Sequence, residues 1–219
     1  MAMYVENRRF ADEAEPVGLL TEGAAGVAVI VLAIIALAGT SVEALASIAT
    51  IVIGVGLMVQ AFNSAAEETK MMTADTTASR QQAAFGGEVM VDLMCGIAGV
   101  VLGILALVGI STVHLVPAAL IVFGGALLLS GVMSMRPRAF STANAAGQTQ
   151  LVSYQGSAAV SGMEILIGLA AIVLGMLSVI FAATVSWVLV LVGFIAVGAA
   201  LLLVSATVSG AVVRLFTTA

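Results

Sequence analysis

The sequence predicts an all-α integral membrane protein with six transmembrane helices, arranged as three helical hairpins of the same orientation. Of its 219 residues, 62% are hydrophobic and only 9% are charged, and the mean hydropathy is +1.22. A soluble domain carries roughly 25% charged residues, so lipid must be the solvent for most of this chain. Six apolar stretches are long enough to cross a hydrocarbon core, which takes about 20 residues of helix. Within these stretches, one sequence pattern occurs three times.

The repeated pattern starts with an acid and has a glycine four residues later. It reads acid-x-x-x-Gly-[Val/Ile/Leu]-Ala-x-[Ile/Val]-Val-Leu-[Ala/Gly] and begins at Glu22, Asp92 and Glu164, so the copies lie 70 and 72 residues apart. The helix that follows each copy also repeats, as Ile-x-x-Gly-x-x-Leu-[Met/Leu] around Gly54, Gly124 and Gly198. One unit of two helices therefore occurs three times.

Hydropathy and short turns place the six spans. They cover residues 17–39, 43–62, 87–109, 114–135, 160–181 and 184–212. The two helices of each unit are joined at Gly39-Thr40-Ser41, at Gly109-Ile110-Ser111 and around Ala182-Ala183. Thr40 and Glu43 fit a capping box, in which the hydroxyl and the carboxylate accept hydrogen bonds from free backbone N–H groups. Such short connections predict antiparallel hairpins.

The hairpins divide the chain into six segments. These are a polar cytoplasmic N-terminus (1–16), hairpin 1 (17–62), a cytoplasmic loop (63–86), hairpin 2 (87–135), a second cytoplasmic loop (136–159), and hairpin 3 with the C-terminus (160–219). Each unit contains two spans, so every unit enters the membrane from the same side. We therefore expect the units to be related by rotation about the membrane normal, rather than by inversion as in many carriers.

The basic residues predict the orientation in the membrane. All seven lie on the side of the long loops and the chain ends: Arg8, Arg9, Lys70, Arg80, Arg136, Arg138 and Arg214. The opposite side carries only Glu43 and His114. The positive-inside rule then predicts a multi-pass protein of the inner cell membrane with both termini in the cytoplasm.

Small residues at matched positions are predicted to form the helix contacts. The glycines in question are Gly26, Gly96, Gly168, Gly103, Gly175, Gly54, Gly124 and Gly198. Small side chains let membrane helices approach closely, which matters because lipid removes the hydrophobic drive for association. Gln60 and Asn63, near the end of the second span, are expected to hydrogen-bond to neighbouring helices.

The three repeated acids, Glu22, Asp92 and Glu164, are the candidate functional residues, and Glu88 adds a fourth carboxyl one turn before Asp92. Charges inside a membrane span are expensive and mark candidate sites, so a ring of acids could attract cations, share protons or bind a basic partner. The structural interpretation is that the acids lie near helix N-termini, complement the helix dipole and reach the headgroup region. We favour the structural interpretation, because the acids lie at shallow depth.

Catalysis and metal binding find little support in the sequence. With one histidine, His114, and one cysteine, Cys95, there is no nucleophile–base pair, so the protein is predicted not to be an enzyme. Met90, Met94 and Cys95 cluster in the third span, where soft sulfur ligands could hold Cu(I), but apolar filling is the favoured interpretation. We therefore predict no metal site, no cofactor and no nucleic-acid partner.

The hairpin pattern resembles the short-repeat membrane family typified by the acid-resistance protein HdeD. Residues 96–107 carry Gly-x-x-x-Val-Val-Leu-Gly-x-Leu-x-Leu, and residues 121–131 carry Ile-Val-x-Gly-Gly-x-Leu-Leu-Leu-x-Gly. The proline often found between such helices is present only as Pro117. The resemblance implies about six spans in three hairpins and a small inner-membrane protein, linked to stress. It implies no catalytic residues, and it does not extend to the three acids.

Two functions follow from these observations. The favoured one is a non-enzymatic structural or accessory subunit that assembles with itself or with other membrane-protein subunits in the lipid bilayer. The alternative is a channel or transporter for protons, cations or a small neutral solute, using Glu22, Asp92 and Glu164.

The orientation can be tested with single cysteines in a Cys95→Ala background. Ser41→Cys lies in a hairpin turn and Ser141→Cys in a long connection between hairpins, so a membrane-impermeant thiol reagent should label them from opposite sides of the membrane. Labelling of both from the same side would contradict the hairpin assignment.

Overall fold

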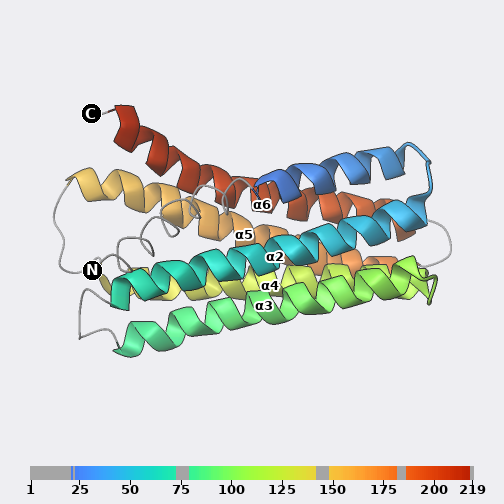
Figure 1. Cartoon of the computed structure of the whole chain (residues 1–219), viewed down its shortest axis with the longest axis horizontal. Helices are drawn as coiled ribbons and strands as arrows, with labels where there is room; N and C mark the ends of the chain where they lie inside the picture. The colour runs from blue at the N-terminus through green and yellow to red at the C-terminus, as the bar shows by residue number, and fades with distance from the viewer. Residues whose placement is uncertain (1–20, 22, 73–78, 142–147, 182–185, 218–219) are drawn as a thin grey trace, which may run out of the picture.

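The computed structural model describes residues 21, 23–72, 79–141, 148–181 and 186–217, and almost all of these are helical. An unlabelled helix, Gly23–Leu37 (blue in Figure 1), comes first. It is followed by α2 (Val42–Met72), α3 (Ser79–Leu107), α4 (Thr112–Ser141), α5 (Gln148–Ile180) and α6 (Ser186–Thr217). The prediction of an all-α membrane protein is confirmed, because five helices contain apolar spans of 19 to 24 residues.

The helices α2 to α6 are longer than their apolar spans. The spans are Val42–Ala65, Val89–Leu107, Thr112–Val132, Gly162–Ile180 and Trp187–Ser205. The predicted loops 63–86 and 136–159 are correspondingly helical for most of their length, with only 73–78 and 142–147 outside the described residues. Hydropathy marks where the lipid-compatible sequence ends, not where the helix ends. The α5 helix, for example, begins about 20 Å before its apolar span, at 1.5 Å per residue.

The first two hairpin turns have the same backbone conformation. Gly39 and Gly109 have φ angles of +92° and +89°, which glycine adopts without strain. Their N–H groups donate to the carbonyls of Ala36 and Ala106, both at 3.0 Å, which closes the preceding helix. The third predicted turn, around 182–183, and the predicted N-terminal segment 1–16 lie outside the described residues. We call this end of the molecule the turn end, and the opposite end, where α2 and α4 finish, the loop end.

The predicted capping box at Thr40 and Glu43 is not formed as expected. The α2 helix begins at Val42, so Glu43 is its second residue rather than its third. The Thr40 hydroxyl donates to the carbonyl of Ile35, at 2.9 Å, and so caps the C-terminus of the preceding helix. The C-terminal carbonyls of a helix also lack partners within the helix, and they compete for the same hydroxyl.

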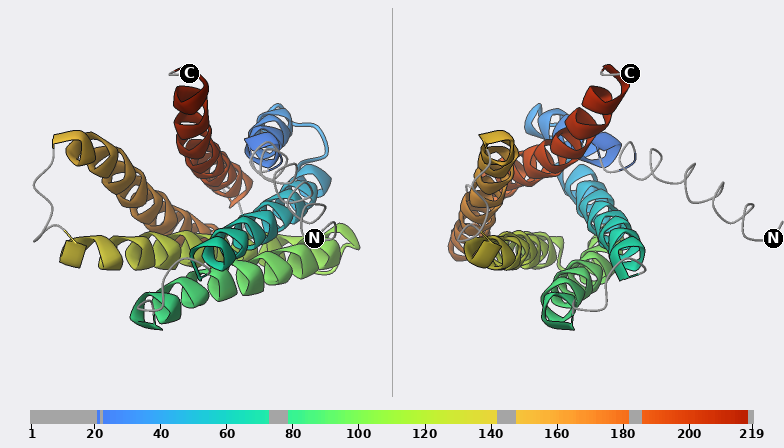
Figure 2. Two further views of the ribbon diagram at one scale, coloured as in Figure 1. Left: turned by 60° about the vertical axis from the view of Figure 1, so that its left-hand side comes forward. Right: turned by 90° about the vertical axis from the view of Figure 1, so that its left-hand side faces the viewer.

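The helices α2, α4 and α6 line the centre of the molecule, and Gly23–Leu37, α3 and α5 lie outside them; Figure 2 shows the helices arranged around a common axis. The inner helices α2, α4 and α6 all contact one another. Each outer helix occupies a groove between two inner helices. The first groove, between α6 and α2, holds Gly23–Leu37; the second, between α2 and α4, holds α3; the third, between α4 and α6, holds α5.

The core consists of matched residues from the three inner helices, aligned on Gly54, Gly124 and Gly198. From the turn end towards the loop end, the sets are Ala46, Val116 and Val190; Thr50, Leu120 and Phe194; Ile53, Phe123 and Val197; and Leu57, Leu127 and Leu201. Every one of these side chains is at most 2% exposed. Thr50 is tolerated there because its hydroxyl donates to the Ala46 carbonyl of its own helix, at 2.8 Å. Large apolar side chains therefore fill the centre.

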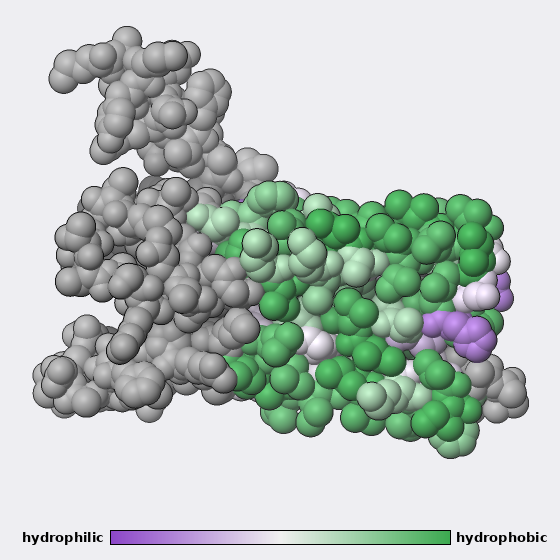
Figure 3. Space-filling model, turned by 90° about the horizontal axis from the view of Figure 1, so that it is seen from below, coloured by the Kyte–Doolittle hydropathy of each residue, from purple (hydrophilic) through white to green (hydrophobic). Residues whose placement is uncertain are grey.

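The outward faces of the outer helices are apolar. The matched residues Val31, Val101 and Val173 are 47%, 50% and 47% exposed. Figure 3 shows a hydrophobic surface over most of the described part of one side, with hydrophilic residues gathered near one end. Such a continuous apolar surface is suited to lipid.

The repeated glycines join each outer helix to the inner helix of the neighbouring hairpin. Gly96 of α3 lies against Gly54 of α2, and Gly168 of α5 lies against Gly124 of α4. Gly26 lies against Gly198 of α6, so the same contact joins the first hairpin to the third. An added Cβ at any of these glycines would lie 2.6 to 3.0 Å from a carbonyl oxygen of its partner glycine. We call these three contacts the glycine seams, and together they close a ring.

Replacement of a seam glycine should weaken the bundle. A Cβ at Gly168 would lie 2.6 Å from the Gly124 carbonyl oxygen and 2.7 Å from the Leu128 nitrogen, and backbone atoms cannot rotate away. We expect Gly168→Ala to destabilise the fold by about 1–3 kcal/mol, as overpacking typically does. Unfolding in mild detergent measures the effect. Ala170→Leu, at an exposed position two residues away, should have little effect and is the control.

Candidate functional site

The repeated acids of α3 and α5 are buried. Asp92 is 2% exposed and Glu164 is 8% exposed. Each belongs to the buried face that its helix turns into its groove, and among the described side chains it is the first residue of that face. These faces are Asp92, Gly96, Gly99, Gly103 and Ala106 on α3, and Glu164, Gly168, Ala171, Gly175 and Ser178 on α5. Glu22, and the side chain of Glu88, lie outside the described part of the chain.

The helix-dipole explanation of the acids does not hold for Asp92 and Glu164. The α3 helix begins at Ser79 and α5 begins at Gln148, more than three turns before the respective acid. The effect of the dipole on a side chain falls off within the first turn. Burial also contradicts the expectation that these carboxyls reach the headgroup region. The sequence interpretation went wrong because it set the helix start at the edge of the apolar stretch.

Polar side chains of the inner helices accompany the acids at the loop end. Ser130 of α4 is 2% exposed and Ser205 of α6 is 6% exposed, and both lie near the end of an apolar span. Asp92, Glu164, Ser130 and Ser205 all have interaction partners. No Lys or Arg occurs among the residues whose side chains the structure describes. As far as the side chains are described, the buried faces that carry the two carboxyls otherwise consist of glycine, alanine and serine.

The two described acids occupy separate grooves. Asp92 belongs to the second groove and Glu164 to the third, and the inner helix α4 lies between them. One turn towards the turn end, Leu57, Leu127 and Leu201 are at most 2% exposed and fill the centre of the ring. A common path from the acids along the axis is thus blocked by leucine in this conformation.

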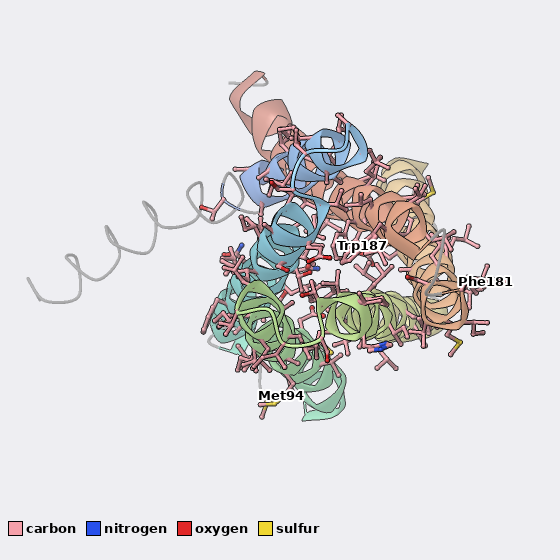
Figure 4. All side chains as sticks on the ribbon, turned by 90° about the vertical axis from the view of Figure 1, so that its right-hand side faces the viewer. Met94, Phe181 and Trp187 are labelled. Atoms are coloured by element: carbon pink, nitrogen blue, oxygen red, sulfur yellow. The ribbon has the colours of Figure 1, made fainter. Side chains whose placement is uncertain are left out.

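The sulfur-containing residues of α3 do not gather around one point. Met90 and Met94 are 61% and 59% exposed, and Figure 4 shows Met94 on the outside of the ring. The same figure shows Phe181 outside and Trp187 on the inner side of α6. Cys95 is a free, half-buried thiol. The described residues contain no group of three or more His, Cys, Asp or Glu side chains suited to a metal ion.

His114 lies at the turn end, in the first turn of α4, and is exposed. The acids lie at the loop end, so the only imidazole is separated from them by most of the bundle. The imidazole is therefore not a neighbour of the Cys95 thiol, which lies on α3 three residues after Asp92.

Gln60 and Asn63 differ from expectation. Both were expected to hydrogen-bond to neighbouring helices, but Oε1 of Gln60 and Nδ2 of Asn63 are buried without a hydrogen-bond partner in the described part of the chain. Gln60 itself is only 8% exposed. Sequence reasoning could identify these residues by their polarity inside a span, but not the lack of a partner, which depends on the opposing helices.

Comparisons with protein-family models, with curated proteins and with solved structures found no match to this chain.

The contribution of the buried acids to the stability of the fold can be measured by substitution. Asp92→Ala removes a buried polar group that has an interaction partner, and we expect a loss of about 1–3 kcal/mol. Asp92→Asn keeps a polar group of the same size and should lose much less. Met94→Ala, two residues along α3 and exposed to lipid, is the control. Equal stability of Asp92→Ala and the wild type in detergent unfolding would show that the acid has no structural role.

Proposed function

We propose that this chain is a non-enzymatic structural or accessory subunit of a membrane assembly, formed with copies of itself or with other membrane proteins. The observation that carries the proposal is the extension of α2 to α6 beyond their apolar spans, all at the loop end. Helices that pass the lipid boundary give a partner outside the bilayer a rigid element to bind. Figure 1 shows these extensions at one end of the molecule.

The composition of the extensions supports a protein or headgroup partner. Most of the basic residues fall on them: Lys70 on α2, Arg80 on α3, Arg136 and Arg138 on α4, and Arg214 on α6. The positive-inside rule predicts that the protein lies in the inner membrane with this end and both termini in the cytoplasm. The resemblance to the HdeD-type family fits the same proposal, since it implies a small inner-membrane protein without catalytic residues.

The closed interior supports a role in assembly over one in transport. A channel or transporter that uses Glu22, Asp92 and Glu164 needs a hydrated path between the acids and the far side of the membrane. The burial of Asp92 and Glu164 favours that alternative, because buried acids in membrane spans often serve transport. The matched core residues argue against the transport alternative. Four successive sets of buried side chains fill the centre of the ring, and all of these side chains are apolar except Thr50, which hydrogen-bonds to its own helix.

Cross-linking in native membranes tests the proposal. In a Cys95→Ala background, Ser141→Cys places a thiol at the loop end of α4, and Ser111→Cys places one in a turn at the opposite end. A thiol-reactive bifunctional cross-linker should trap species of higher mass through Ser141→Cys. The matched Ser111→Cys protein should give far less product, because no extension of the helices surrounds it.

Mass measurement after extraction in mild detergent identifies the partner. Additional copies of this chain, or a constant set of other membrane proteins, would support the subunit proposal. A single chain without cross-links from Ser141→Cys would contradict it, and cation or proton flux in proteoliposomes would then favour the transport alternative.

A further inference from the structure

Two buried polar atoms on one face of α2 have no hydrogen-bond partner among the described residues. Oε1 of Gln60, a hydrogen-bond acceptor, and Nδ2 of Asn63, a donor, are both buried. The residues are three apart, so they lie one turn apart on the same side of the helix. A buried polar group without a partner costs about 1–3 kcal/mol, so two in neighbouring turns require an explanation.

The surroundings of these atoms follow from contacts one turn deeper. Gly56, four residues before Gln60, packs against Ala25 and Leu201, with a Cβ position 3.4 Å from each. The face of α2 that carries Gln60 is therefore directed at the first groove, between α2 and α6. Ser205 lies four residues after Leu201, again on the same face of its helix.

Gly23 brings the outer helix to the same place. A Cβ at Gly23 would lie 3.0 Å from the Ser205 hydroxyl oxygen. The hydroxyl itself donates to the carbonyl of Leu202, at 3.0 Å, and so is engaged within its own helix. Three helices thus meet at one level with Gly23, Gln60 and Ser205, and Asn63 lies one turn nearer the loop end. We call these four residues the amide site.

The other two grooves differ at the matched positions. Where the first groove has Gly23, the second has Leu93 and the third has Ile165. In the sequence, the positions matched to Gln60 and Asn63 are Ser130 and Met133 for the second groove, and Val204 and Thr207 for the third. Neither of these grooves has an amide at the matched positions, and each has a bulky apolar residue on its outer helix. At these matched positions, only the first groove has a glycine on its outer helix and two primary amides on its inner helix.

We propose that the amide site binds water. An ion would satisfy only half of the pair, because a cation suits the Gln60 oxygen and is repelled by the Asn63 N–H group, while an anion has the opposite preference. Water donates to the oxygen and accepts from the N–H, and it does so for either orientation of the two amides. Buried water of this kind typically makes about three hydrogen bonds to such groups.

The position of the site gives the water a route of entry. Gln60 lies five residues before the end of its apolar span at Ala65, which corresponds to about 7 Å of helix. Asn63 is closer still to the loop end. The first groove is thus hydrated at its mouth, whereas Leu57 and Leu201, a turn deeper, keep water out of the core.

Nuclear magnetic resonance of the full chain in detergent or nanodiscs tests the proposal. The side-chain amide protons of Asn63, identified by loss of their signals in Asn63→Leu, should show Overhauser cross-peaks to a long-lived water. Spectra at mildly acidic pH limit the contribution of chemical exchange. This measurement needs only the wild-type protein for its main result, so it stands even if a variant folds poorly.

Two variants locate the water. Gly23→Ala adds a methyl group to the site and should abolish the cross-peak, and Gln60→Leu should weaken it by removing the second anchor. Ala24→Leu, at the neighbouring exposed position, is the control and should leave the cross-peak unchanged.

Four results would overturn the proposal. They are the absence of a water cross-peak in the wild type, a cross-peak to lipid or detergent protons in its place, a cross-peak that appears only with a hydroxylic solute such as glycerol, and a water cross-peak that persists unchanged in Gly23→Ala.

Discussion

The approach of one glycine backbone to another is the contact on which the rest of the structure depends. Lipid is as apolar as leucine, so membrane helices gain little from burying apolar side chains against each other. Their association rests on close packing, and glycine gives the closest packing because two backbones can touch. In this chain the contact occurs at Gly54 with Gly96, at Gly124 with Gly168 and at Gly198 with Gly26. The last of these contacts joins the helix Gly23–Leu37 to α6 and closes the ring.

Once the seams set the spacing of the helices, the core must fill the space that remains, and it does so by compensation. Phe123 of α4 lies against Gly99 of α3, and Leu120 of α4 lies against Gly193 of α6. Each of these large side chains therefore packs against a glycine, which has no side chain. The matched sets in the core differ in size, as with Thr50, Leu120 and Phe194, yet all are buried. The ring is symmetric in its backbone contacts and only approximately so in its side chains.

The sequence predicts the helices and the position of each seam, because both follow from local patterns. Apolar length gives the spans, and the glycines recur at fixed distances from the acids. It does not predict which helices a seam joins. Gly96 could equally have met the second helix of its own hairpin, and only the three-dimensional structure shows that it meets Gly54 of the preceding one. The burial of Asp92 was missed for a related reason. The acid was placed near a helix end, whereas α3 continues to Ser79 through sequence too polar for the lipid.

The three units are alike in the seams and differ at the loop end, for a physical reason. In the middle of each seam a Cβ would collide with backbone atoms, so glycine is required in every copy. At the loop end the grooves are close to water. A polar side chain there can hydrogen-bond to water instead of being buried without a partner. A change of side chain is therefore less costly there than in the seam. Matched positions at this level do differ in polarity: Gln60, Ser130 and Val204 on the inner helices, and Gly23, Leu93 and Ile165 on the outer ones. A ring built from one repeated contact can thus present different side chains in each of its three grooves at the loop end.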